Sequence, residues 1–172
     1  PILMQRTPYS SAPYGEGRLK TKIGPNEHLM KDGYIIVYQD VRGRWMSEGV
    51  YDNMRAYLPN KKANESDEVS DTYDTIDWLV KNIPNNNGNV GVFGTSYPGF
   101  YANMAAHSNH PAIKAVSPQA PVSEWFIGDD FHHNGAFMLL DAFNFYTGFG
   151  KPRPTPTNWP ATKPIKKLNC PS

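Results

Sequence analysis

The chain has 172 residues, enough for one domain with a sizeable core, and hydrophobic residues make up 39% of it. Its formal net charge of +1 gives no electrostatic reason to expect a nucleic-acid or anionic-membrane partner. The apolar runs are also far shorter than the roughly 20 residues that a membrane-spanning helix needs.

The cysteine and histidine positions give little reason to expect a disulfide or a metal site. Cys170 is the one cysteine, so it has no partner within these residues for a disulfide. His132 and His133 are adjacent, which places them on different faces of a helix or strand, and no Cys/His spacing typical of zinc is present. We therefore expect no metal and no cofactor.

The first half of the chain shows strand and helix patterns in turn. A short apolar strand over Ile2–Gln5 is followed by a proline that ends it. Residues 27–31 fit the last turn of a helix, and residues 34–39 form a β-rich run without alternation, typical of a strand covered on both faces. Apolar residues then recur every three or four positions over residues 68–83, which predicts an amphipathic helix.

The second half continues the alternation. We expect a strand over residues 89–93, a helix over 100–107, an interior strand over 112–116 and a helix over 137–149. Strands that alternate with helices predict a parallel sheet with helices on both of its faces. The fold class is therefore α/β.

The residues after the 89–93 strand indicate a catalytic turn. Gly94 and Gly99 flank Ser96, although the common nucleophile elbow has its second glycine two residues after the serine rather than three. A strand before this turn and a helix after it would expose the Ser96 hydroxyl on a strained backbone. The Tyr97 amide, at the helix N-terminus, could then stabilise an oxyanion. The simpler alternative is a serine that only caps the helix.

Four motifs carry a resemblance to a known family. The segment 94–100 resembles the nucleophile motif of the X-Pro dipeptidyl-peptidase and cocaine esterase group, and residues 6–9 and 39–49 agree with it. Residues 128–132 are similar to one branch, the α-amino-acid ester hydrolases, also described as cephalosporin or glutaryl acylases. The resemblance implies a partial α/β-hydrolase fold, with core over residues 1–128 and the start of a helical cap over 129–172. It also implies an N-terminal fragment of the catalytic domain.

The resemblance assigns roles to five residues. It makes Ser96 the nucleophile, and the Tyr97 amide and the Tyr9 hydroxyl the oxyanion donors. It places Asp130, and with less support Asp129, in a carboxylate cluster that binds the α-ammonium group of the substrate. From the residues alone, Tyr9 could equally be a packed aromatic, and the two aspartates a solvated loop pair or a helix cap.

Other residues are expected around this site. We expect Trp125, Phe131, Phe137 and Phe143 to line an acyl pocket, although aromatic residues at such spacing also suit a core. Asp40, Arg42 and Glu48 are expected to shape the neighbouring loop through ion pairs. The resemblance places the acid and histidine of the catalytic triad after a helical cap, beyond residue 172. His107 and His110 lie at the far end of the helix after Ser96 and do not replace them, whereas His132 and His133 could approach from a cap.

These residues predict a serine hydrolase or acyl transferase that acts on esters or amides of α-amino acids, inactive as this piece alone. Three alternatives stay open: an X-Pro dipeptidyl-peptidase, a general carboxylesterase, and a non-catalytic binding domain that lacks the triad acid and base. The expected partner is a small ester, amide or peptide, and a homo-oligomer is compatible with the sequence. The compartment is undetermined, although the resemblance suggests a periplasmic or secreted protein.

Overall fold

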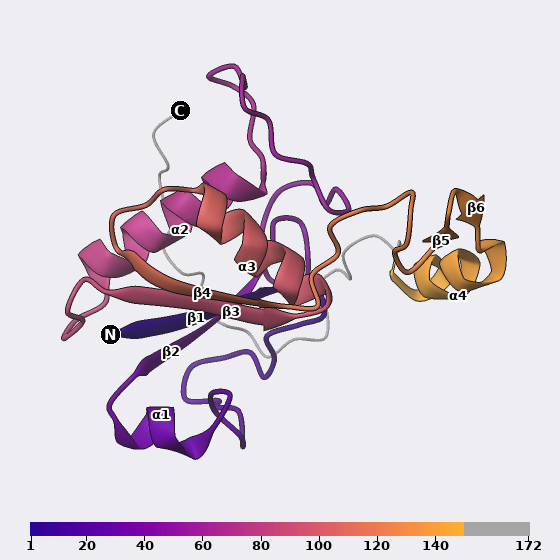
Figure 1. The fold of residues 1–172 in the computed structure, drawn as a ribbon. Coiled ribbons are helices and arrows are strands. Elements are labelled where there is room, and N and C mark those ends of the chain that lie inside the picture. Colours follow the sequence, from indigo (N-terminus) through magenta and orange to yellow (C-terminus); the bar gives the residue numbers. More distant parts are fainter. Residues whose placement is uncertain (150–172) are drawn as a thin grey trace.

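A four-stranded parallel sheet is the centre of the computed structural model, which describes residues 1–149 (Figure 1). Its strands are β1 (Ile2–Thr7), β2 (Ile35–Asp40), β3 (Val90–Thr95) and β4 (Ile113–Gln119), in the order β2-β1-β3-β4. Every pairing is parallel, so all four carboxyl ends lie at one edge of the sheet. The predicted α/β class is confirmed.

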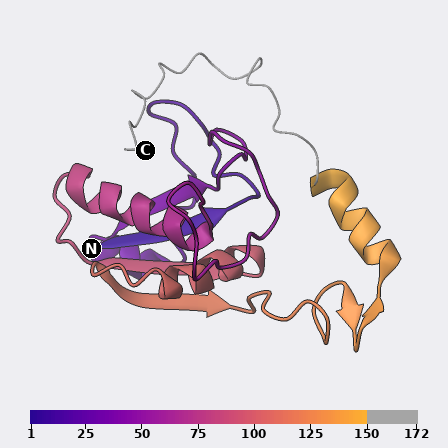
Figure 2. The same cartoon turned by 90° about the horizontal axis from the view of Figure 1, so that it is seen from above.

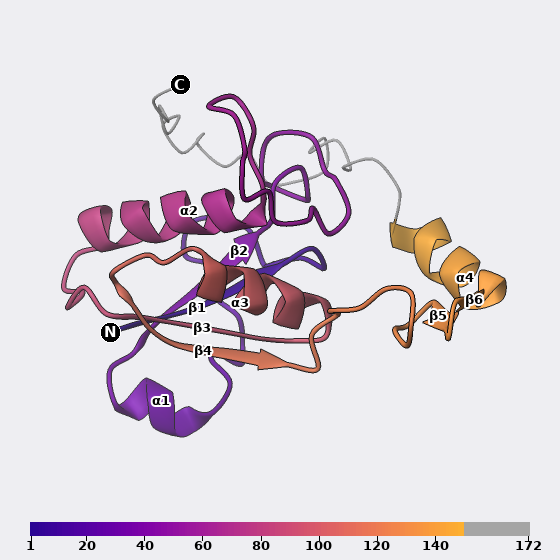
Figure 3. The ribbon, with the colours of Figure 1, turned by 45° about the horizontal axis from the view of Figure 1, so that its top comes forward.

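Helices lie on both sides of the sheet. α2 (Glu68–Asn82) and α3 (Tyr97–His107) cover one face, and the short α1 (Glu27–Lys31) lies on the other (Figures 1 and 3). Asp67 begins α2 with a capping box, in which its carboxylate accepts from the Ser70 amide and the Ser70 hydroxyl accepts from the Asp67 amide.

The main core lies between the sheet and the α2–α3 layer. Two alanines of α3, Ala102 and Ala105, are fully buried and let the helix approach the strands closely. Aliphatic side chains from β1, α2 and β3 fill the remaining space, each contributing roughly 1.5–3 kcal/mol by burial. The cluster consists of Ile2, Met4, Ile76, Leu79, Val90, Val92, Ala102, Ala105 and Ala112.

Two strands are less buried than predicted. Within residues 1–149, β2 and β4 are the outer strands of the sheet, each with one neighbour. β2 is half-buried until Asp40, and β4 alternates between half-buried and exposed positions, so the expectation of interior strands over 34–39 and 112–116 was wrong in this respect. An apolar run indicates two apolar faces, but it does not reveal whether another strand covers the edge.

A smaller unit follows the sheet. Residues 120–131 connect β4 to a hairpin of β5 (His132–His133) and β6 (Ala136–Phe137), and then to α4 (Leu139–Phe149) (Figure 2). Phe149, at the end of α4, packs into a second cluster with residues of α2 and α3. The proline-rich residues from 151 onward and Cys170 lie outside the described residues.

Candidate active site

Ser96 occupies a strained turn between β3 and α3. Its φ and ψ angles of 61° and −122° lie in a region that residues with a side chain rarely adopt. The Ser96 amide donates to the Gln119 carbonyl over 2.9 Å, and the Ser96 carbonyl accepts from the Phe100 amide over 3.1 Å, so both sides of the turn are fixed. The side chain makes no cap hydrogen bond and is exposed. Ser96 therefore occupies the N-cap position of α3, but its hydroxyl does not cap the helix.

Two glycines make this turn possible. A Cβ atom at Gly94 would lie 2.1 Å from the carbonyl oxygen of Pro98, and one at Gly99 would lie 2.6 Å from the carbonyl oxygen of Gln119. Both distances are shorter than atoms can approach without moving the backbone. Gly99 thus lets α3 pass close to the end of β4, which explains the wider spacing after the serine.

Tyr97 contributes both its backbone and its side chain to the site. As the first residue of α3, it has an amide without an acceptor inside the helix, at the positive end of the helix dipole. Its buried hydroxyl lies 2.7 Å from the Tyr51 hydroxyl, accepts from the Met54 amide over 3.1 Å, and also bonds Asn53 Oδ1. Burial raises the pKa of Tyr97 far above its usual value, so the phenol stays neutral.

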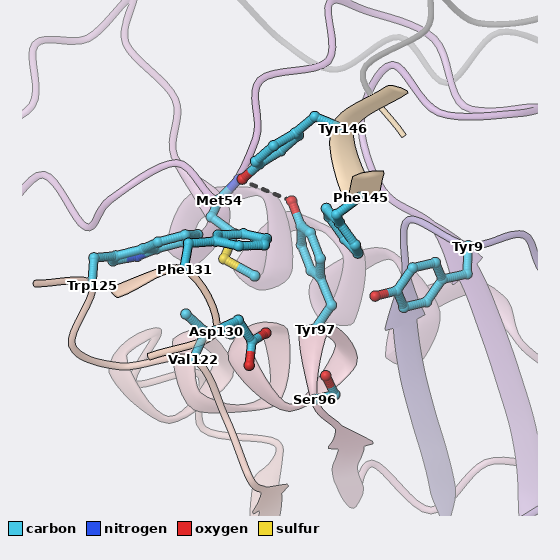
Figure 4. A pocket seen from close by; sticks show the side chains of 10 residues that line it. All are labelled: Tyr9, Met54, Ser96, Tyr97, Val122, Trp125, Asp130, Phe131, Phe145 and Tyr146. Carbon is cyan, nitrogen blue, oxygen red and sulfur yellow. Dashed lines mark hydrogen bonds between the residues drawn. The ribbon is translucent and has the colours of Figure 1, made fainter. Parts of the chain in front are cut away.

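A pocket of about 60 Å³ opens beside Ser96 (Figure 4). The Ser96 hydroxyl, the Tyr9 hydroxyl and the Asp130 carboxylate point into it from three different segments of the chain. The rest of the wall is mainly apolar and aromatic, a composition typical of small-molecule sites. The lining residues are Tyr9, Met54, Ser96, Tyr97, Val122, Trp125, Asp130, Phe131, Phe145 and Tyr146.

Tyr9 is held at the pocket by the segment that follows β1. The carbonyl of Pro8 accepts hydrogen bonds from Arg44 Nε over 3.1 Å and from Trp45 Nε1 over 3.0 Å. The Tyr9 ring makes edge contacts with Tyr97 and Phe149, with centroids 5.9 and 5.3 Å apart. Burial, and then the negative charge of Asp130, raises the pKa of Tyr9. Its hydroxyl therefore stays protonated and able to donate at neutral pH.

The two adjacent aspartates differ in their surroundings. Asp129 closes a turn, because its carboxylate accepts from the Asp130 amide over 2.7 Å and from the Ser123 amide over 3.2 Å. Asp130 instead faces the pocket, and its charge raises the pKa of both Tyr9 and Tyr146 after the larger effect of burial. Of the pair, Asp130 is placed to meet a ligand.

The aromatic wall differs in part from the prediction. Trp125 and Phe131 line the pocket, but Phe137 and Phe143 are 54% and 64% exposed and do not. The reason is the direction of α4, which turns Phe145, Tyr146 and Phe149 toward the core. Phe143 lies two positions before Phe145 on the helix, and its side chain is on the exposed side of α4.

A buried ionic network links the end of β1 to α2. Arg6, at 1% exposure, lies 3.3 Å from the carboxylate of Glu68. Arg55 pairs with Glu68 over 3.0 Å and with Asp71 over 2.5 Å, and Arg42 pairs with Asp71 as well. These residues come from β1, two loops and α2, so the network ties the end of β1 to the helix layer. Because the paired residues are far apart in the sequence, no local pattern predicted these ion pairs.

Asp40 shapes the neighbouring loop through hydrogen bonds. Its carboxylate accepts from the Ser11 amide and hydroxyl, each over 2.7 Å, and from the Tyr14 hydroxyl over 2.6 Å. Burial and this contact with Asp40 raise the pKa of Tyr14 to about 12. The predicted ion pairs are therefore wrong for Asp40, which accepts hydrogen bonds from residues 11–14, and Arg42 pairs with Asp71 of α2 instead.

The histidines lie elsewhere in the described residues. None lines the pocket, and His107 and His110 lie at or beyond the opposite end of α3 from Ser96. His110 Nδ1 accepts from the Ala112 amide over 3.1 Å, and its Nε2 lies 3.8 Å from Asp77. Over residues 1–149, no group of three or more potential ligands could hold a metal ion. No helix in the same range is long and apolar enough to cross a membrane.

Two named proteins resemble the chain in sequence. It is 29% identical over 139 residues to the cocaine esterase of Rhodococcus sp. (strain MB1 Bresler), covering 81% of this chain and 22% of that protein. It is 26% identical over 142 residues to a putative Xaa-Pro dipeptidyl-peptidase of Bacillus anthracis, covering 76% of this chain and 21% of that protein.

Two solved structures, both α/β hydrolases, share the fold. An α-amino acid ester hydrolase matches with a TM-score of 0.72 and 39% identity, over 86% of this chain and 25% of that one. An aminopeptidase from a marine sediment archaeon, Thaumarchaeota archaeon, matches with a TM-score of 0.75 and 38% identity, over 88% of this chain and 26% of that one. The chain thus spans about a quarter or less of the length of these proteins.

The family comparison covers almost the whole chain, since residues 1–169 match the family described as X-Pro dipeptidyl-peptidase (S15 family). With the parallel sheet, the strained serine turn and the relatives above, it leads to one assignment: the chain belongs to the S15 X-Pro dipeptidyl-peptidase family.

Proposed function

We propose that Ser96 is the nucleophile of a serine hydrolase that transfers the acyl group of α-amino acid esters or amides. The observation that carries this proposal is the strained turn, which presents an exposed Ser96 hydroxyl to a pocket shared with Tyr9 and Asp130. Strain of this kind costs of order 1–3 kcal/mol and persists where a function maintains it.

The reaction begins when Ser96 Oγ attacks the substrate carbonyl carbon and its proton passes to a general base. The carbonyl oxygen becomes an oxyanion, which accepts hydrogen bonds from the Tyr97 amide and the Tyr9 hydroxyl. The tetrahedral intermediate then expels the alcohol or amine, which leaves with a proton from the base. Water or an amine next attacks the acyl-serine and releases Ser96. No histidine lines the pocket within residues 1–149, so we infer that the base and its acid partner come from outside these residues.

Asp130 suits recognition of a free α-ammonium group. Its carboxylate lies at a pocket whose other walls are largely aromatic, so a substrate cation would find a single anionic partner there among the lining residues. Hydrogen bonds to charged groups are stronger than neutral ones, typically by about a factor of two. This favours amino acid esters or peptides with a free amino terminus over plain esters.

A serine-reactive fluorophosphonate probe tests the nucleophile. We expect the full-length protein to be labelled at Ser96, and the Ser96→Ala variant to lose the label. Ser117→Ala, which changes an exposed serine of β4, is the matched control and should label normally. A wild-type protein that is not labelled at Ser96 contradicts the proposal and favours the non-catalytic binding domain.

Activity on a panel of substrates distinguishes the proposed function from the two alternatives in the same family, an X-Pro dipeptidyl-peptidase and a general carboxylesterase. The named relatives include an esterase and a putative Xaa-Pro dipeptidyl-peptidase, so the panel needs paired esters with a free or an acylated amino group, and an X-Pro amide. We expect Asp130→Asn to lower kcat/KM about tenfold or more for the free-amine member of each pair only. Asp129→Asn is the control, since that carboxylate serves a turn. Equal losses on both members would remove the ammonium role.

A further inference from the structure

Asn53 joins two walls of the pocket through its side-chain amide. Its Oδ1 accepts from the hydroxyl of Tyr51 over 3.1 Å and from that of Tyr97. Its Nδ2 donates to the hydroxyl of Tyr146 over 2.7 Å. One half-buried residue of the 51–54 loop thus connects the first residue of α3 to the inner face of α4.

The two ends of this bridge are not equally secured. At the α3 end, the Tyr97 hydroxyl has further partners in the Met54 amide and the Tyr51 hydroxyl, and its ring stacks on Tyr101 with centroids 5.3 Å apart. The α3 side therefore keeps its position without Asn53.

At the α4 end, Tyr146 depends more on Asn53. Its ring contacts Phe131 and Phe145, with centroids 5.4 and 5.3 Å apart. Those ring contacts are weakly directional, whereas the hydrogen bond from Asn53 fixes the position of the hydroxyl.

Tyr146 forms part of the pocket wall together with Phe131, whose ring it contacts (Figure 4). α4 is connected to β4 through residues 120–131 and a hairpin of two-residue strands, so its placement depends on contacts with the core. The bond from Asn53 is one such contact, and it acts directly on a pocket residue.

We propose that Asn53 is a positioning residue, which fixes the Tyr146 wall relative to Ser96 and thereby sets selectivity for the size of the acyl group. The inference rests on the proposed function, because it takes the pocket as the acyl site. A bulky acyl group would contact the aromatic wall, whereas an acetyl group would not reach it. Loosening the wall should therefore penalise the bulky substrate more.

Paired p-nitrophenyl esters test this in the full-length protein, through the ratio of kcat/KM for the phenylacetate to that for the acetate. We expect Asn53→Ala and Tyr146→Phe each to lower this ratio about 5- to 10-fold, mainly through KM, as the loss of one hydrogen bond would. The double variant should lose no more than either single variant, because both remove the same bond. Tyr57→Phe, which changes an exposed tyrosine stacked on His107, should leave the ratio unchanged.

The outcomes separate this inference from the function on which it rests. If kcat/KM falls equally for both esters, Asn53 has a general structural role and the inference is overturned. Additive losses in the double variant also overturn it, because Asn53 would then act through something other than Tyr146. A labelled wild-type Ser96 with an unchanged ratio rejects the positioning role alone. An unlabelled wild-type protein rejects both.

Discussion

At the scale of single residues, Ser96 is held in a conformation that glycine adopts more readily. Its φ of 61° and ψ of −122° place Cβ in a crowded arrangement, and the hydrogen bonds to Gln119 and Phe100 keep it there. We expect Ser96→Gly to raise the free energy of unfolding by about 1 kcal/mol relative to Ser96→Ala, because the strain disappears. Urea unfolding measures this difference. Equal stability of the two variants would show that the turn stores no strain.

The Tyr9 hydroxyl is separable from the packing of its ring. Tyr9→Phe keeps the edge contacts with Tyr97 and Phe149 and removes only the proposed oxyanion donor. We expect kcat to fall about 10²- to 10³-fold with little change in KM, because the lost bond strengthens as charge develops. Steady-state kinetics of the full-length protein, with Tyr57→Phe as control, measure this. A decrease of less than threefold would leave Tyr9 as a packed aromatic.

The sequence predicted some of these residues and not others, for a physical reason. Ser96 stands between a strand pattern and a helix pattern, so its local context indicated a turn. Tyr9 and Asp130 were found through motifs of a known family. Asn53 and Tyr146 are 93 positions apart, and their hydrogen bond arises only when α4 meets the 51–54 loop. No local periodicity encodes such a contact.

At the scale of elements, the helices and strands agreed well with the sequence. α2 begins at Glu68, where the prediction placed it, and α1 has the predicted bounds. Periodicity reports which face of an element is apolar, and that was sufficient to locate these elements. The order β2-β1-β3-β4, and the outer position of β2 and β4 within residues 1–149, depend on tertiary pairing. The sequence therefore predicted the class of the sheet but not the exposure of its strands.

The Asp67 carboxylate, at the N-cap of α2, should make the free energy of unfolding depend on pH. Burial opposes ionisation of Asp67, but hydrogen bonds from the Ser70 and Leu58 amides and from Lys61 outweigh it and lower its pKa to about 2. A carboxylate whose pKa is lowered on folding stabilises the protein above the unfolded value of 3.8. That stabilisation, on the order of 2 kcal/mol, is lost as the pH falls from about 4 to 2.

Asp67→Asn isolates this charge, because asparagine caps a helix as well as aspartate does. We expect the variant to be less stable at pH 7 and to lose less stability between pH 4 and pH 2 than the wild type. Thermal unfolding across this range provides the measurement. Asp77→Asn, in the exposed pair with Lys81, is the control and should change the profile less. Parallel profiles for wild type and Asp67→Asn would contradict the assignment.

At the scale of the whole molecule, the unit that follows β4 exposes six large apolar side chains. Each of these side chains is at least 54% exposed. Exposed apolar surface of this kind favours contacts with another molecule. The outer strands β2 and β4 add backbone groups that are unpaired on one side within the described residues. The exposed apolar residues are Phe126, Ile127, Phe137, Leu139, Leu140 and Phe143.

These surfaces should make the 172-residue chain self-associate when it is expressed alone, since association removes apolar area from water. We expect sedimentation velocity to show concentration-dependent oligomers, and the Leu140→Lys, Phe143→Lys double variant to shift them toward monomer. The double variant Leu19→Lys, Val50→Lys is the matched control, because it adds the same charge at side chains that are 75% and 83% exposed but lie in the loops before α1 and after β2. If the control acts as strongly as the Leu140→Lys, Phe143→Lys variant, net charge rather than the α4 surface governs association. A monomer at every concentration would show that the exposed side chains and strand edges do not drive association.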